Sequence, residues 1–89
     1  MSASLHSAEY DVFRELLLSA REKSGLTQVD VAQRLQKPQS FVSKYERGER
    51  RLDFTEFMAL IPVLGIDLAE FVAGYESRLA SRVLLQPKM

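Results

Sequence analysis

The sequence of residues 25–51 is GLTQVDVAQRLQKPQSFVSKYERGERR, and this stretch decides the fold. Thr27 and Asp30 have the spacing of a capping box, in which two side chains bind free backbone N–H groups at the start of a helix. The apolar residues that follow share one helical face. The pattern predicts a helix at about 28–35, in which the small Ala32 leaves room for a closely crossing helix.

A second short helix is predicted after a brief break in the pattern. Pro38 disfavours helical geometry at the residue before it and suits a helix start, where its missing N–H does no harm. The predicted helix runs from 38 or 39 to Arg47, with Val42 and Tyr45 facing inward. Two helices of this length joined by a short break form a helix-turn-helix unit.

A longer helix is predicted before this unit, at residues 8–24. Ser7 can cap it by accepting a hydrogen bond from a free backbone N–H, and Gly25 can end it. Its apolar side chains have the spacing of one helical face and are Phe13, Leu16, Leu17 and Ala20.

Two amphipathic helices are predicted after the unit, each opened by a capping-box pair. Asp53 with Glu56 opens the first helix, and Pro62 is expected to kink or terminate its last turn. Asp67 with Glu70 opens the second. The apolar stripes are Phe54, Phe57, Met58 and Ile61 in the first helix and Leu68, Phe71, Val72 and Tyr75 in the second. The predicted fold class is all-α, a compact five-helix bundle with the phenylalanines of both stripes in its core.

The chain is expected to form one domain with a flanking segment at each end. Residues 1–6 form a flexible arm, residues 7–75 the helix-turn-helix domain, and residues 76–89 a C-terminal extension. The extension is a candidate dimerisation segment, because its apolar residues have no obvious place in a five-helix core. The candidate interface residues are Ile66, Phe71, Leu79, Val83 and Leu84. The alternative is an extra half-turn packed on its own domain, followed by a loose tail.

The composition is that of a folded domain and excludes several classes of protein. With 89 residues, 46% of them hydrophobic and 27% charged, the chain matches ordinary globular usage. It has no cysteine, so disulfides and thiolate metal sites are excluded. No stretch has the pattern of a secretory signal or the length of a membrane span. A cytoplasmic location without a membrane partner is therefore expected.

The charges are unevenly distributed although their sum is zero. Residues 21–51 carry eight basic and four acidic side chains, whereas residues 52–76 carry five acidic side chains and no lysine or arginine. This division favours one face that binds a polyanion and another that avoids it. The alternative is a scatter of charge over a solvated surface.

Four motifs follow one another along the chain, and together they resemble a known family. They are GLTQ at 25–28, VAxxL at 31–35, PQSFVSKYERG at 38–48 and LGIDL at 64–68. In this order and spacing, the stretch from Phe13 to about Tyr75 resembles the Cro/phage-repressor-like (XRE-type) helix-turn-helix domains. The resemblance implies a homodimer on double-stranded DNA, with the second motif helix in the major groove and half-sites about 34 Å apart.

The resemblance also assigns roles to individual residues. Base contacts are implied for the polar face of the second motif helix, which consists of Gln39, Ser40, Ser43 and Lys44. Gln28 matches a glutamine that holds a phosphate at a helix N-terminus. Three basic residues after the second helix are expected at phosphates, namely Arg47, Arg50 and Arg51. Phe41 lies near the reading face and either packs against the first motif helix or contacts a thymine methyl group.

Arg21 and Glu46 match a family ion pair that ties the first helix to the reading helix. Such a pair is expected to orient the reading helix more than to stabilise the fold. The chain departs from the family pattern at Gln36, where a small residue is usual, and at Pro38, where Ser or Thr usually caps the helix. Both departures lie in the turn that presents the reading helix.

The expected function is transcriptional regulation by a dimeric repressor that reads an operator in double-stranded DNA. Two other classes are an antitoxin-like protein that binds a toxin partner and a protein-interaction bundle that does not read DNA. The carboxylate pairs have the spacing of helix caps, and His6, the single histidine, lies in the arm, so no acid–base dyad or triad is expected. No enzyme activity, no cofactor and no metal site are therefore predicted.

Overall fold

Five α-helices account for the regular structure of residues 7–85, and no strand occurs among them. The computed structural model describes these residues, with side chains up to Arg82. The helices are α1 (Ala8–Ser24), α2 (Gln28–Leu35), α3 (Gln39–Glu46), α4 (Phe54–Leu64) and α5 (Leu68–Leu85). The predicted all-α, five-helix fold is confirmed. The arm expected at residues 1–6 lies outside the described residues.

The starts of α2 and α4 are fixed by their capping boxes. Both reciprocal hydrogen bonds are present at Thr27/Asp30 and at Asp53/Glu56. A side-chain cap contributes about 1 kcal/mol to helix stability, so these pairs define where each helix begins. Pro62, which was expected to kink or terminate the last turn, lies inside α4, and the helix ends two residues later at Leu64. Pro62 is exposed in the last turn, where it removes one backbone hydrogen bond of the helix.

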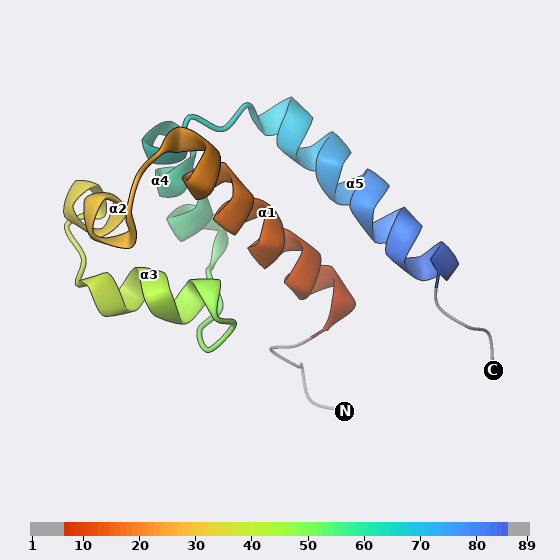
Figure 1. Cartoon of the computed structure of the whole chain (residues 1–89), viewed down its shortest axis with the longest axis horizontal. Coiled ribbons are helices and arrows are strands. Elements are labelled where there is room, and N and C mark those ends of the chain that lie inside the picture. The colour runs from red at the N-terminus through yellow and green to blue at the C-terminus, as the bar shows by residue number, and fades with distance from the viewer. Residues whose placement is uncertain (1–6, 86–89) are drawn as a thin grey trace.

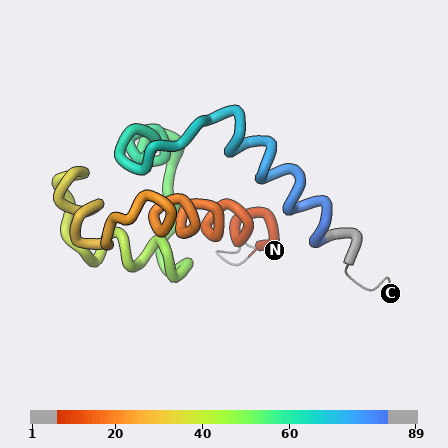
Figure 2. The backbone as a smooth tube through the Cα atoms, turned by 45° about the horizontal axis from the view of Figure 1, so that its top comes forward, coloured from red at the N-terminus to blue at the C-terminus, as the bar shows by residue number. Residues whose placement is uncertain are grey.

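Helix α1 lies in the middle of the domain, between the α2–α3 pair on one side and α5 on the other (Figure 1). Figure 2 shows the same order and the antiparallel course of α5 along α1. An ion pair ties the far end of α5 to α1, since Arg82 donates to Glu15 at 2.9 Å. Helix α4 packs against α2 and α1 and closes the core.

The core collects side chains from the first four helices. Its buried members are Leu17, Val31, Ala32, Val42, Tyr45, Leu60 and Leu64. Fully burying an apolar side chain of this size contributes about 1.5–3 kcal/mol, so these residues supply most of the drive for helix packing. The two residues that were predicted to face inward from α3, Val42 and Tyr45, are 0% and 1% exposed. The opposite face of α3 is thereby turned to solvent.

Some residues of the predicted apolar stripes of α4 and α5 are exposed at the surface and not buried in the core. Phe54 was expected in the core, but it begins α4 at the surface and is 72% exposed. Leu60 and Leu64 fill the core in its place, because the inner face of α4 starts one turn later. In α5, Leu68 and Val72 are 43% and 46% exposed. Part of the apolar pattern therefore lies on the surface, where it can meet a partner.

Helix α5 is longer than the sequence pattern indicates. It continues without a break across residue 75, where the domain was expected to end. Phe71 anchors it, with its ring centroid 6.0 Å from that of Phe13 and 5.2 Å from that of Phe57. The half-turn after residue 75 that was the alternative to a dimerisation segment is instead part of a helix of 18 residues.

Within residues 7–85, no single helix is long and apolar enough to cross a membrane. Helices α4 and α5 reach that length and composition only as a pair, across a bend of 113°.

Candidate nucleic-acid interface

Helix α3 presents the polar residues that were predicted to contact bases. Gln39, Ser40 and Lys44 are exposed, and Ser43 is half-buried. The Ser43 hydroxyl donates to the Ser40 carbonyl at 3.3 Å, within the same helical turn. The structure thus brings all four side chains together on the surface of one short helix. Their contacts with DNA stay a prediction.

The turn between α2 and α3 has a left-handed residue at its centre. Gln36 has φ 59° and ψ 45°, a conformation that glycine adopts more readily than other residues. The following N–H, of Lys37, donates to the Ala32 carbonyl at 2.9 Å and closes the end of α2. Pro38 then occupies the N-cap position of α3, with extended backbone and no side-chain cap. The two departures from the family pattern therefore meet in this turn and set the start of the reading helix.

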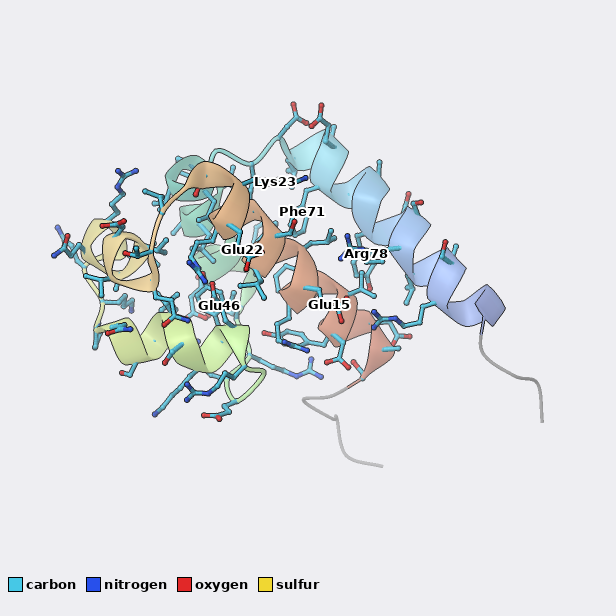
Figure 3. The ribbon with its side chains drawn as sticks, viewed as in Figure 1. Glu15, Glu22, Lys23, Glu46, Phe71 and Arg78 are labelled. Atoms are coloured by element: carbon cyan, nitrogen blue, oxygen red, sulfur yellow. The ribbon has the colours of Figure 1, made fainter. Side chains whose placement is uncertain are left out.

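A chain of hydrogen bonds links α1 to the first residue of α3. Arg21 donates to both carboxylate oxygens of Glu46, with Nε–Oε2 at 2.6 Å and Nη2–Oε1 at 3.1 Å. Gln28 donates to Glu46 Oε1 at 2.8 Å. Gln39 in turn donates to Gln28 Oε1 at 3.2 Å. Figure 3 marks Glu46, the acceptor at the centre of this chain, beside the α3 ribbon.

The buried carboxylate of Glu46 decides how the two glutamines point. Its side chain is 5% exposed, and that of Arg21 is 16% exposed. The hydrogen bond from Arg21 satisfies this buried charge and raises the pKa of the guanidinium. Because a carboxylate has no donor, the amide nitrogen of Gln28 must face it, which leaves Gln28 Oε1 to accept from Gln39. The orientation of Gln39 is therefore set from the interior of the domain.

Two further residues of α1 hold the end of α3 and the loop that follows it. The Tyr10 hydroxyl accepts from the Leu52 N–H at 3.0 Å and donates to the Arg50 carbonyl at 3.4 Å. Arg14 donates to the Glu46 carbonyl at 2.8 Å. Sequence reasoning missed both roles, since a single tyrosine or arginine at a helix surface carries no motif. The only signal was the position of Tyr10 three residues before Phe13, on the same helical face.

The predicted phosphate-binding arginines at positions 47 and 50 already have carboxylate partners within the domain. Arg47 pairs with Glu49 at 3.0 Å, with side chains 56% and 54% exposed. Arg50 binds Glu56 through both terminal nitrogens, at 3.0 and 2.9 Å. These hydrogen bonds raise the pKa of each guanidinium group. An exposed ion pair such as Arg47–Glu49 contributes only about 0–1 kcal/mol, so a phosphate can replace that carboxylate at small cost.

Aromatic rings support the basic side chains next to α3. The Phe41 ring packs edge-on against Tyr45 of the same helix, with centroids 5.7 Å apart, and lies against the core. Its ring also lies 4.7 Å from the Arg50 guanidinium and 5.3 Å from Lys37 Nζ. Arg51 lies over the Tyr10 ring at 4.6 Å. Sequence reasoning did not single out Lys37, and its place over an aromatic ring is visible only in three dimensions.

The residues that were predicted to form a dimer interface are distributed over three environments. Ile66 and Phe71 pack against the core of their own domain. Leu79 is half-buried on α5. Val83 and Leu84 belong to α5, but their side chains lie outside the described residues. A dimer interface therefore stays a prediction.

No cluster of His, Asp or Glu with the geometry of a metal site occurs in the described part of the chain. The carboxylates of Asp53 and Glu56 each accept from the other residue's backbone N–H at the start of α4, and the Asp67 carboxylate accepts from the Glu70 N–H at the start of α5.

Comparison with known proteins places this geometry among helix-turn-helix proteins. Residues 17–71 match the helix-turn-helix family. A solved XRE-family-like protein from Pseudomonas syringae pv. tomato strain DC3000 is 45% identical, covering 80% of this chain and 87% of that one, with a TM-score of 0.73. A comparison with curated proteins found no match.

Two more distant structures share the fold. The clp gene regulator ClgR from Corynebacterium glutamicum is 17% identical, covering 91% of this chain and 85% of that one, with a TM-score of 0.74. A point mutant of the restriction-modification controller protein C.Esp1396I is 22% identical, covering 98% of this chain and 100% of that one, with a TM-score of 0.68. At these identities the likeness concerns the fold alone.

Proposed function

We propose that this chain, which belongs to the XRE-type helix-turn-helix family, is a dimeric repressor that reads an operator in double-stranded DNA through the major groove. One observation carries the proposal. The exposed polar face of α3 begins with Gln39, and a hydrogen-bond chain from a buried carboxylate fixes the direction of its amide. A side chain that is held in place before binding loses little entropy when it meets a base.

The fixed amide has the polarity that adenine requires. Gln39 uses one N–H to bind Gln28, which leaves it one N–H and its carbonyl oxygen. Adenine presents an acceptor and a donor side by side in the major groove, and glutamine pairs with both. Lys44, one turn on from Ser40, is suited to guanine, whose groove edge carries two acceptors. Each half-site is therefore expected to contain an adenine and a guanine.

Phosphate contacts are assigned to the residues around α3. Gln28 lies at the N-terminus of α2, where free N–H groups attract an anion. Arg47 is held by an exposed ion pair that a phosphate can replace, and Arg50 by a partly buried pair with Glu56. Arg51 follows them in the same loop. These contacts fix the register of the domain on DNA without specifying sequence.

The dimer is assigned to α5, the helix on the far side of α1 from α3 (Figure 1). Leu68, Val72, Tyr75 and Leu79 are spaced by four, three and four residues, which is the repeat of a helix–helix seam. Leu68 and Val72 are each more than two fifths exposed, so the seam is open to a partner. Of the residues predicted for the interface, this assignment retains Leu79. The central role passes to Leu68 and Val72.

Selection of bound sequences from a random pool of duplex DNA tests this function. The expected result is a palindrome with half-sites about 10 base pairs apart and an A·T pair and a G·C pair fixed in each half. A pool that shows no enrichment after repeated rounds would contradict sequence-specific binding. Enrichment of single, unpaired half-sites would contradict the dimer. As a regulator of transcription the protein would act in the cytoplasm, at the nucleoid.

An antitoxin that binds a toxin partner is the second candidate. The observation that favours it is the exposed pair Phe54 and Met58 on α4, at 72% and 40%, which the DNA-reading role does not use. This function requires a stable complex with the product of a neighbouring gene when the two are produced together. Its absence at micromolar concentration would eliminate this candidate.

A further inference from the structure

A groove of about 650 Å³ lies between α1 and α5. Its size falls within the range of about 300–1,000 Å³ that small-molecule sites occupy. Apolar groups form its floor and come from Leu16, Ala20, Leu64, Ile66, Phe71 and Gly74. Figure 3 shows Phe71 between the two ribbons, with Lys23 towards the start of α5 and Arg78 further along it. The α2–α3 pair lies on the other side of α1, so the groove is separate from the DNA-reading face.

The two ends of the groove carry opposite charge. Asp67 and Glu70 line the end at the start of α5, where Lys23 is the single cation, so this end is net negative. Arg78 lines the other end, 3.8 Å from Glu15. Both oxygens of that glutamate already accept from Arg82, at 2.9 and 3.2 Å.

The Arg78 end therefore has a spare positive charge. One carboxylate faces two guanidinium groups there, and Arg78 holds only the longer of the two contacts. Its side chain is 46% exposed, so it can turn to a ligand without losing a strong partner. Ser19 lines the same groove and offers a hydroxyl donor.

Gly74 keeps the floor of the groove open although the helix does not require a glycine there. Its φ is not in the left-handed region, and a Cβ at this position would approach Leu16 no closer than 3.9 Å. Glycine destabilises a helix interior relative to alanine, yet alanine would fit. The residue thus contributes space to the groove and no packing advantage to the helix.

We propose that this groove binds a small amphipathic carboxylate, with its chain on the apolar floor and its head group on Arg78. The polarity of the groove selects an anion at the Arg78 end and repels one from the end with Asp67 and Glu70. An apolar floor with a few convergent polar groups is the usual make-up of a ligand site. The site does not depend on the proposed DNA binding.

Titration of the full-length ¹⁵N-labelled protein with decanoate, below its micelle-forming concentration, tests the site by NMR. Saturable shifts with a stoichiometry of one are expected at the amides of Leu16, Ala20, Phe71 and Gly74. Decyltrimethylammonium, which has a chain of the same length and a cationic head group, is expected to bind more weakly than decanoate. Absence of saturation, or equal binding of the cation, would overturn the proposal.

Two charge-matched variants test the orientation of the ligand. Arg78→Gln is expected to weaken decanoate binding about fivefold, the upper range for one exposed ion pair. Lys23→Gln, at the acidic end of the same groove, is expected to change it less than about twofold. A larger loss in Lys23→Gln than in Arg78→Gln would contradict the assignment of the head group.

A third variant tests the floor. Gly74→Leu fills the groove and is expected to abolish saturable binding. If it instead disturbs the packing of α5, the Arg78→Gln comparison still decides, because that side chain lies at the surface and is 46% exposed. Unchanged decanoate binding in a folded Gly74→Leu protein would contradict the groove as the site.

Discussion

At the scale of single residues, the turn before the reading helix is strained at Gln36. A non-glycine residue in the left-handed region costs about 1–2 kcal/mol, and glycine recovers this at the expense of greater freedom in the unfolded chain. We expect Gln36→Gly to raise the free energy of unfolding by about 0.5–1 kcal/mol, measured by urea denaturation.

Gln33 supplies a matched control for this substitution, because it is exposed within α2 and has an ordinary helical backbone. Gln33→Gly should lower the free energy of unfolding by about 0.5–1 kcal/mol. If both variants change the free energy of unfolding in the same direction, the left-handed conformation of Gln36 is not the cause of the change.

Also at this scale, sequence reasoning named all four residues of the hydrogen-bond chain but did not predict that they bind one another. Arg21 and Glu46 were paired by resemblance, and Gln28 and Gln39 were assigned to DNA separately. Their mutual contacts depend on the crossing of α1, α2 and α3, which sequence spacing does not encode. The same holds for the Arg50–Glu56 pair, in which a predicted phosphate contact and a predicted helix cap bind each other.

At the scale of helices, α5 is less stable than it could be because of Gly74. Alanine fits this position at ordinary van der Waals distance and has the higher helix propensity. We expect Gly74→Ala to raise the free energy of unfolding by about 0.5–1 kcal/mol, measured by thermal or urea unfolding. The reverse change at its exposed neighbour, Ala73→Gly, should lower it by a similar amount. A destabilised Gly74→Ala protein would mean that α1 and α5 pack too closely at this position to accept a methyl group.

The start of α4 links stability to pH. The hydrogen bond from Arg50, followed by that from the Asp53 backbone, lowers the pKa of Glu56 below its ordinary value of 4.5. A carboxylate with a lowered pKa stabilises the fold above its ordinary value and loses this effect as the pH falls through the folded value. We expect the free energy of unfolding to decline below about pH 4.5, and less steeply in Glu56→Gln. Carboxylates titrate at roughly pH 3 to 5. If the free energy of unfolding falls equally steeply with pH in the two proteins over this range, Glu56 does not have this role.

Helix boundaries were more predictable than helix faces. The predicted limits of the first two helices, 8–24 and 28–35, agree with α1 and α2, because caps and terminal glycines act locally. The inner face of α4 was misjudged at Phe54, since an apolar residue at the first position of a helix can point to solvent or to the core. Only the neighbouring helices decide between the two.

At the scale of the whole molecule, the apolar stripe of α5 predicts association of two copies. Val72 is 46% exposed at the centre of this stripe. We expect Val72→Glu to convert the dimer to a monomer in light scattering at micromolar concentration, because a buried unpaired charge is costly. Val29→Glu on α2 is the matched control, since this valine is 44% exposed and lies outside α5. A monomeric parent protein, or an unchanged dimer in Val72→Glu, would contradict the assignment.

The charge pattern also belongs to this scale. Overall neutrality conceals a basic segment around α3 and an acidic segment at residues 52–76, which covers α4 and the first half of α5. The sequence could predict this division, but not that Glu49 and Glu56 would pair with the arginines nearest to the reading helix. Those pairs lower the positive charge of the face until a polyanion displaces them.

The central claim is that the exposed face of α3 reads DNA sequence, and discrimination between two duplexes tests it most directly. The affinity of the protein for the selected operator is measured against a scrambled duplex by fluorescence anisotropy at one salt concentration. The parent protein and Gln33→Ala are predicted to prefer the operator by about a thousandfold or more. Gln39→Ala is predicted to lose about 1–3 kcal/mol of this preference per half-site, with little change on the scrambled duplex. Equal affinity of the parent for both duplexes, or an unchanged preference in Gln39→Ala, would contradict the claim.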